Sequence, residues 1–382
     1  MTPNARLSVP PRPLPHRRGR AAFSLVELMV VIGIIALLAG LLLPAITNSQ
    51  TSAEQLETQT ELSRFDNALI AFQREYGQYP PSFFVINENP QKWYLSTSLT
   101  DEEKIRRDDS LRTIRALFGQ QFDVSAIDPV DINGDGSVPS DVMTDGDTIY
   151  LNGAESLVFF LGGMMVDGPS GSRVPIGFSR DGTFPFSLTT TSNRTQPFEF
   201  DGSRFVDLDG DGMLEYLDAF TNQQTPYQYF SAYGGSGYRP AGFDGLINER
   251  EASPAADDIV DDETIVIGTG SGTQLIGPRF AYHKLDSGGT GASIDMDQPW
   301  NPDTYQILSP GQDGLYGLGG SFDPDQGLET PTGARDFGAV SDLGFNNLKV
   351  ADKSLLTGSN LTRNPALERD NISNFSEGRM GN

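Results

Sequence analysis

The chain has 382 residues and a formal net charge of −24, and such an acidic surface repels nucleic acid and favours cations. It contains no Cys, which excludes disulfides, thiolate catalysis and a Cys-ligated zinc ion. The two His residues, His16 and His283, exclude a metal centre built from several His side chains. The 42 Gly and 25 Pro favour a loop-rich body containing β-structure over a helical bundle.

Residues 1–22 form a basic leader with five Arg, many Pro and no acidic residue, and we do not expect it to fold. Residues 23–46 follow as an apolar run whose one charge is Glu27. At a rise of ~1.5 Å per residue this run makes a helix long enough to cross a bilayer core of ~30 Å. No basic residue follows the run before Arg64, so the positive-inside rule places the leader in the cytoplasm and the rest of the chain in the periplasm or outside the cell.

Glu27 is the unusual residue of the apolar run, because an unpaired carboxylate in a membrane helix costs up to ~3 kcal/mol. The stretch Ala22-Phe23-Ser24-Leu25-Val26-Glu27-Leu28, after a basic leader, resembles the prepilin cleavage and methylation motif of type IV pilins and type II secretion pseudopilins. Read from the residues alone, the alternative is an ordinary signal anchor that tolerates a Glu.

The resemblance implies that a prepilin peptidase cuts between Ala22 and Phe23 and methylates the new amino group. Glu27 would then pair with the Phe23 ammonium of a neighbouring subunit, which the reference pKa of ~7.7–8.0 keeps largely protonated. The family has Gly before the cut where this chain has Ala22, which is also small.

Residues 47–80 continue the helix in an amphipathic form. The predicted apolar stripe consists of Leu56, Leu62, Phe65, Leu69, Phe72 and Tyr76. Gly77 suits the position just after a helix end, and Pro80-Pro81 prevents continuation. The sequence from Ala68 to Pro80 resembles the helix exit of the major pseudopilin of type II secretion.

Residues 81–348 are predicted to form an α+β globular domain with an antiparallel sheet, followed by a polar C-terminal tail over 349–382. Thr100-x-x-Glu103 and Asn152-x-x-Glu155 are capping boxes that open helices ending near Phe118 and at Gly162-Gly163. The predicted strands are 198–206, 227–233, 264–267, 279–283 and 305–308. The runs beginning at Tyr227 and Tyr305 echo each other, and 234–263 is expected to be a mobile loop.

Three acidic loops are candidate calcium sites, and the first begins at Asp207. Counting Asp207 as position one, acids stand at one, three, five and twelve, with Gly at six. This is the spacing of an EF-hand-like loop, and Ca²⁺ takes six to eight oxygen ligands. The predicted ligands are Asp207, Asp209, Asp211, the Met213 carbonyl and Asp218. The alternative is a solvated acidic turn.

The second loop resembles a dockerin-type loop and has Asp131, Asn133, Asp135 and Ser137 as predicted ligands. Its position twelve is Val142 and Asp141 lies one residue short, so the closing ligand is left to Asp145 or Asp147; an acidic turn is again the alternative.

The third loop, Ser309-Pro310-Gly311-Gln312-Asp313-Gly314, resembles the calcium loop of the major pseudopilin. That resemblance implies Asp313 as a ligand, with Asp323 and Asp325 as nearby candidates. Calcium at three loops would do what disulfides do in other exported domains.

The sequence offers no Gly-x-Ser-x-Gly elbow and no phosphate-binding Gly-rich loop with Lys, so we do not expect an enzyme. The resemblance implies a pilin-like fold and a filament subunit, a pseudopilin of a type II secretion-like machine. Its partners would be copies of itself or other pseudopilins, the prepilin peptidase, the inner-membrane secretion platform and, before assembly, membrane lipid. The alternative function is a membrane-anchored calcium-binding adhesin that uses the leader only for export.

Overall fold

A computed structural model describes a little over half of the chain. The described residues are 25–89, 91, 101–119, 129–138, 148–168, 173–181, 184–188, 193–208, 210–232, 265–267, 274–276, 282–285, 294–316, 370–376 and 379–380. The leader with the Ala22–Phe23 junction, the loop 234–263, and Asp141, Asp145, Asp147, Asp209, Asp323 and Asp325 lie outside them. The chain divides into two compact units, residues 1–50 and 51–382, which we describe separately.

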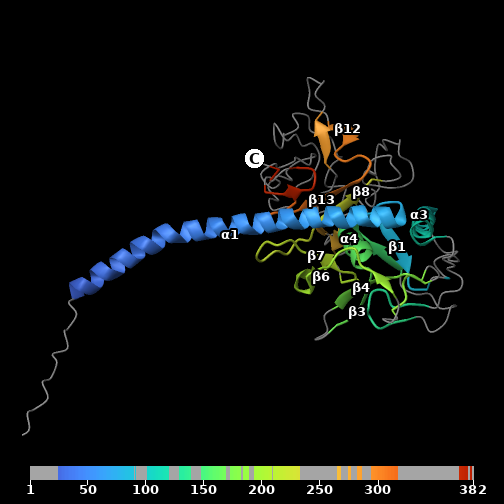
Figure 1. The fold of residues 1–382 in the computed structure, drawn as a ribbon, viewed down its shortest axis with the longest axis horizontal. Helices are drawn as coiled ribbons and strands as arrows, with labels where there is room; N and C mark the ends of the chain where they lie inside the picture. Colours follow the sequence, from blue (N-terminus) through green and yellow to red (C-terminus); the bar gives the residue numbers. More distant parts are fainter. Residues whose placement is uncertain are drawn as a thin grey trace, which may run out of the picture. The chain divides into compact units, whose positions relative to one another are not determined.

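Helix α1 (Leu25–Tyr76) supplies all the described structure of the first unit, up to Gln50 (Figure 1). Its turns continue through Gly33, Gly40 and Pro44 without interruption. Among the described residues it is the one helix that is long and apolar enough to cross a membrane. This confirms the long N-terminal apolar helix expected from residues 23–46.

In the second unit, α1 buries one face in the hydrophobic core. Leu62, Phe65, Leu69 and Phe72 are at most 3% exposed, as the predicted stripe requires. Leu56 is 64% exposed, so its place in the stripe was wrong. The reason is geometric: at ~100° per residue, six residues separate Leu56 from Leu62 by about 120° around the helix.

The helix ends where the sequence indicates. Gly77 has φ +83°, and its N–H donates to the Gln73 carbonyl oxygen at 2.8 Å. This left-handed residue terminates the helix at Tyr76.

Helices α3 (Asp101–Phe118) and α4 (Gly153–Gly162) match the two predicted capping signals. At α4 the capping box is complete. The Asn152 side chain accepts from the N–H groups of Ala154 and Glu155, and the Glu155 carboxylate accepts from the Asn152 N–H at 2.9 Å. Every residue of α4 is buried, so it is the central helix of the core.

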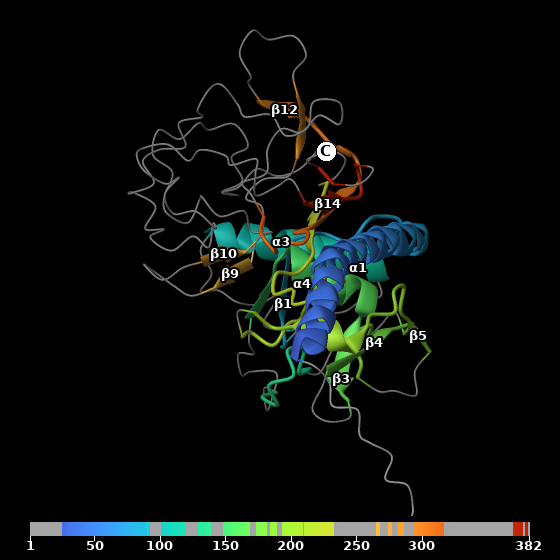
Figure 2. The ribbon, with the colours of Figure 1, turned by 90° about the vertical axis from the view of Figure 1, so that its left-hand side faces the viewer.

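All named strand pairs are antiparallel, which confirms the α+β expectation. The pairs and small sheets are β1 (Phe84–Asn87) with β2 (Thr148–Leu151); β3 (Met164–Asp167), β4 (Arg173–Ser179) and β5 (Arg194–Thr195); β6 (Phe205–Val206) with β7 (Glu215–Tyr216); β8 (Gln228–Ser231), β13 (Tyr305–Ser309) and β14 (Ile372–Ser373); β9 (Ile265–Ile267) with β10 (Gln274–Ile276); and β11 (His283–Leu285) with β12 (Ile294–Pro299). Within the second unit, Figures 1 and 2 both place β12 on one side of α1 and β3 and β4 on the other.

The predicted strand over 198–206 is reduced to β6. Asp201 accepts from the Ser203 N–H and so caps a short 3-10 helix, Gly202–Arg204, inside the predicted run. Upstream, the Phe198 ring stacks on Phe65 of α1, with ring centroids 4.3 Å apart. Phe198 and Phe200 therefore pack against Phe65 of α1, and strand pairing in this run is limited to β6.

The two runs that echo each other in sequence lie side by side. Strands β8 and β13 pair with Tyr305 opposite Ser231 and Leu308 opposite Gln228. Strand β14, from the range assigned to a polar tail, joins the outer edge of β13, and Ile372 is 1% exposed. The described C-terminal residues are thus part of the folded domain.

Candidate functional site

The apolar segment of α1 in the first unit exposes its side chains to the surroundings. The large hydrophobic residues from Leu25 to Ile46 are 48–73% exposed. A continuous apolar surface of this size is typical of a segment that meets lipid or other helices. Glu27 lies in the first turn of α1 and is the one acidic residue there.

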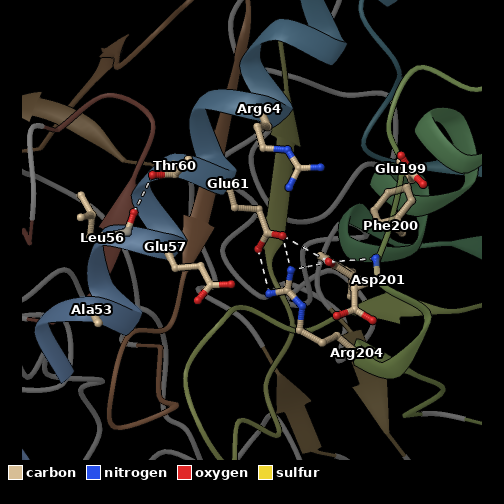
Figure 3. A pocket seen from close by; sticks show the side chains of 11 residues that line it. Ala53, Leu56, Glu57, Thr60, Glu61, Arg64, Glu199, Phe200, Asp201 and Arg204 are labelled. Carbon is tan, nitrogen blue, oxygen red and sulfur yellow. Dashed lines mark hydrogen bonds and ion pairs between the residues drawn. The ribbon is translucent and has the colours of Figure 1, made fainter. Parts of the chain in front are cut away.

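In the second unit, a buried carboxylate fixes α1 to the domain. Glu61 is 3% exposed and forms a two-pronged ion pair with Arg204, with Arg204 Nη1 2.9 Å from Glu61 Oε2 (Figure 3). Tyr227 donates its hydroxyl to Oε2 at 2.8 Å, and Tyr216 donates to Oε1 at 3.2 Å. Burial and the Glu61 charge raise the pKa of Tyr216 to about 12, so its hydroxyl stays protonated as a donor.

The ion pair lines an open pocket of about 620 Å³ between α1 and the segment 199–204. Glu57 and Thr60 of α1 line it on one side and Glu199 and Asp201 on the other (Figure 3). Glu61 and Arg204 satisfy each other, which is the arrangement of a structural anchor. Sequence reasoning missed Glu61, although it lies four residues before Phe65 and so on the buried face.

The first acidic loop is closed by its own carboxylates. Asp207 accepts from the Gly210 N–H at 2.7 Å through Oδ1 and from the Gly212 N–H at 3.2 Å through Oδ2. Asp211 accepts from the Met213 N–H at 2.8 Å. Both glycines have positive φ, +81° and +90°, a conformation that few other residues adopt.

The second loop repeats this pattern. Asp131 accepts from the N–H groups of Gly134 and Gly136, which have φ +76° and +79°. Asn133 accepts from the Asp135 N–H, and Asp135 accepts from the Ser137 N–H. The two predicted loops therefore share one backbone design.

Each of these loops also rests on a buried glutamate that the sequence did not single out. Glu88, 1% exposed, accepts from the Ile132 N–H at 2.9 Å, and Glu215, fully buried, accepts from the Leu208 N–H at 3.1 Å. Ile132 and Leu208 occupy the same second position of their loops, so the support is equivalent.

Asp218 does not close the first loop in this structure but reaches the third one. Its Oδ2 accepts from the Ser309 hydroxyl at 2.6 Å, and its Oδ1 accepts from Gln223 Nε2 at 3.0 Å. Gln223 also donates to the Gly311 carbonyl oxygen at 3.0 Å. Burial raises the pKa of Asp218 to about 6, against the lowering effect of these hydrogen bonds.

Asp313, the predicted ligand of the third loop, lies next to an acid that the sequence did not indicate. Asp370 accepts from the Asp313 N–H at 2.8 Å, and Asp313 accepts from the Leu315 N–H. Burial, followed by the Asp370 charge, raises the pKa of Asp313 to about 6. Asp313 and Asp370 lie 57 residues apart in the chain, so no local sequence pattern could indicate that they meet.

The donor chemistry of the three loops fits Ca²⁺, because carboxylate, amide, hydroxyl and carbonyl oxygens are the ligands that this ion takes. Within the described part of the chain, however, no three Asp, Glu or His side chains converge on one point. Asp207, Asp211 and Asp218 are thus not gathered into one shell, and Asp209 lies outside the described residues.

A family model for the prokaryotic N-terminal methylation motif matches residues 17–43. Comparison with curated proteins and with solved structures found no match. The matched segment contains the end of the leader, the Ala22–Phe23 junction, Glu27 and most of the exposed apolar run. The motif implies processing by a prepilin peptidase and assembly into pilin-like filaments, and the helix suggests a single-pass membrane anchor. The chain therefore carries a prepilin-type N-terminus on a long apolar helix and is consistent with a type IV pilin-like or pseudopilin precursor.

Proposed function

We propose that this protein is a pseudopilin, a structural subunit of the filament of a type II secretion-like machine. The observation that carries the proposal is Glu27, the one charged residue in the exposed apolar segment of α1 over residues 25–46, most of which the methylation motif covers. A subunit that stayed in lipid would gain from losing this charge. A subunit that leaves lipid for a bundle of like helices needs it as a partner for a neighbour's ammonium group.

The pairing also sets the axial position of neighbouring subunits. Cleavage before Phe23 places the new amino group four residues from Glu27, about 6 Å along the helix axis. Methylation retains the positive charge on this amine. One subunit's Phe23 ammonium and the next subunit's Glu27 then neutralise each other in an apolar surrounding, where an unpaired charge is costly.

The charge distribution supports an orientation with the leader in the cytoplasm and the domain in the periplasm or outside the cell. Five Arg precede the apolar run, and none follows it until Arg64. The secretion platform and prepilin peptidase of the inner membrane are the partners that this orientation requires.

The processing step is tested by the intact mass of the protein recovered from membranes. We expect a mature chain that begins with N-methyl-Phe23. Ala22→Gly should be cut at least as well, and a bulky residue at position 22 much less. A mature chain that begins upstream of Phe23 contradicts the proposal.

The filament role is tested by Glu27→Ala, with Glu27→Asp as the variant that keeps the charge and Glu57→Ala as a control on the same helix. Glu27→Ala should insert into the membrane as well as the parent but enter sheared filaments poorly. Normal incorporation of Glu27→Ala would show that the pairing is not needed. That result would favour the adhesin alternative, which the methylation motif by itself does not favour.

We further propose that Ca²⁺ binds the acidic loops and stabilises the domain. The shared backbone design of the loops at Asp131 and Asp207, with positive-φ glycines at the fourth and sixth positions, supports this proposal. Asp207, Asp211 and the Met213 carbonyl in one loop, and Asp131, Asn133, Asp135 and Ser137 in the other, would supply oxygens. Asp313 would act in the third loop, beside Asp370.

A further inference from the structure

The loops that begin at Asp131 and Asp207 are packed directly against each other. The two are 76 positions apart in the chain, yet the Cα of Gly212 lies so near Asn133 that a Cβ there would be 2.5 Å from the Asn133 carbonyl oxygen. Backbone meets backbone at this contact, with no side chain between. Any substitution of Gly212 would push the loops apart.

One side chain from a third segment binds both loops. Arg173, the first residue of β4, donates through Nη1 to the carbonyl oxygens of Asn133 and Gly212. Through Nη2 it donates to the Ile132 carbonyl oxygen at 3.1 Å. The guanidinium group also fills the space above Gly134, where a Cβ would lie 2.5 Å from Arg173 Cζ.

The charges around Arg173 match this position. Burial lowers its pKa, and the carboxylates of Asp131, Asp167 and Asp207 act in the opposite direction. The first acid of each loop is thus among the groups that stabilise the cation. Arg173 supplies a fixed positive charge to two loops that together carry several acids.

We infer that Arg173 is a positioning residue that joins the two loops into one unit, so that they order and open together. Both loops are held internally by side-chain-to-backbone hydrogen bonds. Beside their direct backbone contact, they share one hydrogen-bond donor, the Arg173 guanidinium group. A planar fork can serve three carbonyl oxygens at once, whereas an ammonium group is a compact point charge on a flexible stem. Arg173→Lys should therefore break the link while keeping the charge.

This inference also deepens the proposed calcium function, and that part of it rests on the proposal. If an ion orders either loop, the carbonyl oxygen of Asn133 or Gly212 in that loop is held in place for Arg173. Arg173 then helps to order the other loop. Calcium binding at the two loops should then be positively coupled.

The link itself is tested without calcium, by hydrogen exchange on the full-length protein in detergent and chelator. Asp131→Ala opens the second loop by removing its two N–H acceptors. With Arg173 present, we expect exchange in the peptide covering 207–216 to rise roughly tenfold, within the range of coupling between linked sites. In an Arg173→Lys background, Asp131→Ala should raise exchange only in the loop that begins at Asp131 and not in 207–216.

Arg194→Lys is the matched control. Arg194 lies on the neighbouring strand β5 and donates to the backbone carbonyl oxygens of Gly177 and Ser187, which belong to neither loop. In that background Asp131→Ala should still raise exchange in 207–216. If exchange in 207–216 does not change on Asp131→Ala in the otherwise unchanged protein, the loops are independent and the inference is wrong, whether or not Arg173→Lys folds.

The calcium part is tested by repeating the exchange measurement over a Ca²⁺ titration. Asp131→Ala should raise the Ca²⁺ concentration that protects 207–216 by roughly tenfold in the otherwise unchanged protein, and not in the Arg173→Lys background. Coupled exchange in chelator with no response to Ca²⁺ would refute the calcium proposal and leave the link standing. If Ca²⁺ protects 207–216 at the same concentration with and without Asp131→Ala, the link is refuted and the calcium proposal stands.

Discussion

At the scale of single residues, the side chains that matter most are the acids of α1 that face the domain. Glu61 is buried, pairs with the partly exposed Arg204, and accepts from two tyrosine hydroxyls. Such an ion pair is a modest source of net stability, but the loss of the carboxylate is costly because the arginine and both hydroxyls lose their acceptor. The Glu61–Arg204 ion pair therefore fixes the position of α1 against the domain.

We expect Glu61→Ala to lower the free energy of unfolding by about 1–3 kcal/mol, since it leaves Arg204 and two tyrosine hydroxyls without their acceptor while the Arg204 side chain stays 20% exposed. Glu61→Gln, which keeps an acceptor and the side-chain volume, should cost less. Denaturant unfolding measured in detergent gives these values, with the exposed Glu57→Gln as the control. A Glu61→Ala variant as stable as the control would mean that the pair contributes nothing.

Asp66, five residues further along α1, gives a prediction for the pH dependence of stability. It accepts from the Tyr305 hydroxyl at 2.9 Å and from Asn374 Nδ2 at 3.3 Å, and burial raises its pKa above the ordinary 3.8. An acid with a raised pKa in the folded state stabilises that state at low pH, and this contribution is lost as the pH rises through the raised value.

Asp66→Asn should accordingly melt higher than the parent at pH 7 and equally at pH 4, because the amide oxygen still accepts both hydrogen bonds without a charge. Melting temperatures measured between pH 4 and 8 test this. A difference that is the same at every pH would show that the effect is not due to ionisation of Asp66.

At the scale of elements, α4 has the strongest local signal and the most buried position. Its capping box satisfies backbone N–H groups that would otherwise be buried without acceptors. The sequence indicated both the cap and the glycines at the end, and the structure confirms them.

Asn152→Ala should destabilise the protein by about 0.5–2 kcal/mol, and by the upper part of that range because the cap is buried. Asn152→Asp retains the acceptor oxygen and should recover most of the loss. Chemical unfolding followed by circular dichroism measures both. Equal stability of the Ala and Asp variants would contradict a role for the side-chain oxygen.

At the scale of the whole molecule, the question is what holds together a domain of small sheets that has no disulfide. One large aromatic-rich core is centred on α1 and α4, and a second, smaller cluster contains Phe230, Tyr282 and Met380. The three acidic loops lie between α3 and β2, between β6 and β7, and at the end of β13. An ion bound there would link segments that the cores do not.

The full-length protein in detergent should therefore melt at a higher temperature in Ca²⁺ than in chelator. Binding to the folded state alone stabilises by ~2.7 kcal/mol at a hundredfold excess over Kd. Asp211→Ala should remove much of the gain and Asp313→Ala a separate part, while the exposed Glu57→Gln should change nothing. Mg²⁺ should substitute poorly because it requires tighter octahedral geometry. A melting temperature that chelator leaves unchanged would show that the loops are acidic turns.

The sequence by itself determined the features whose causes act over a few residues. The apolar run, the Gly77 end of α1, the two capping signals and the turn glycines of the acidic loops are all local, because a helix turn or a cap depends on neighbours within about four positions. The methylation motif is local in the same sense, and it carries the functional conclusion.

The tertiary structure decided what depends on distant partners. Glu61 meets Arg204 across 143 positions, and Asp218 meets Ser309 across 91. Strands β1 and β7 have only four and two residues and are buried on both faces, so no alternation could reveal them. Most of all, Arg173 joins two loops that read as separate sites, because burial of polar groups, and not local preference, requires that these donors and acceptors find each other.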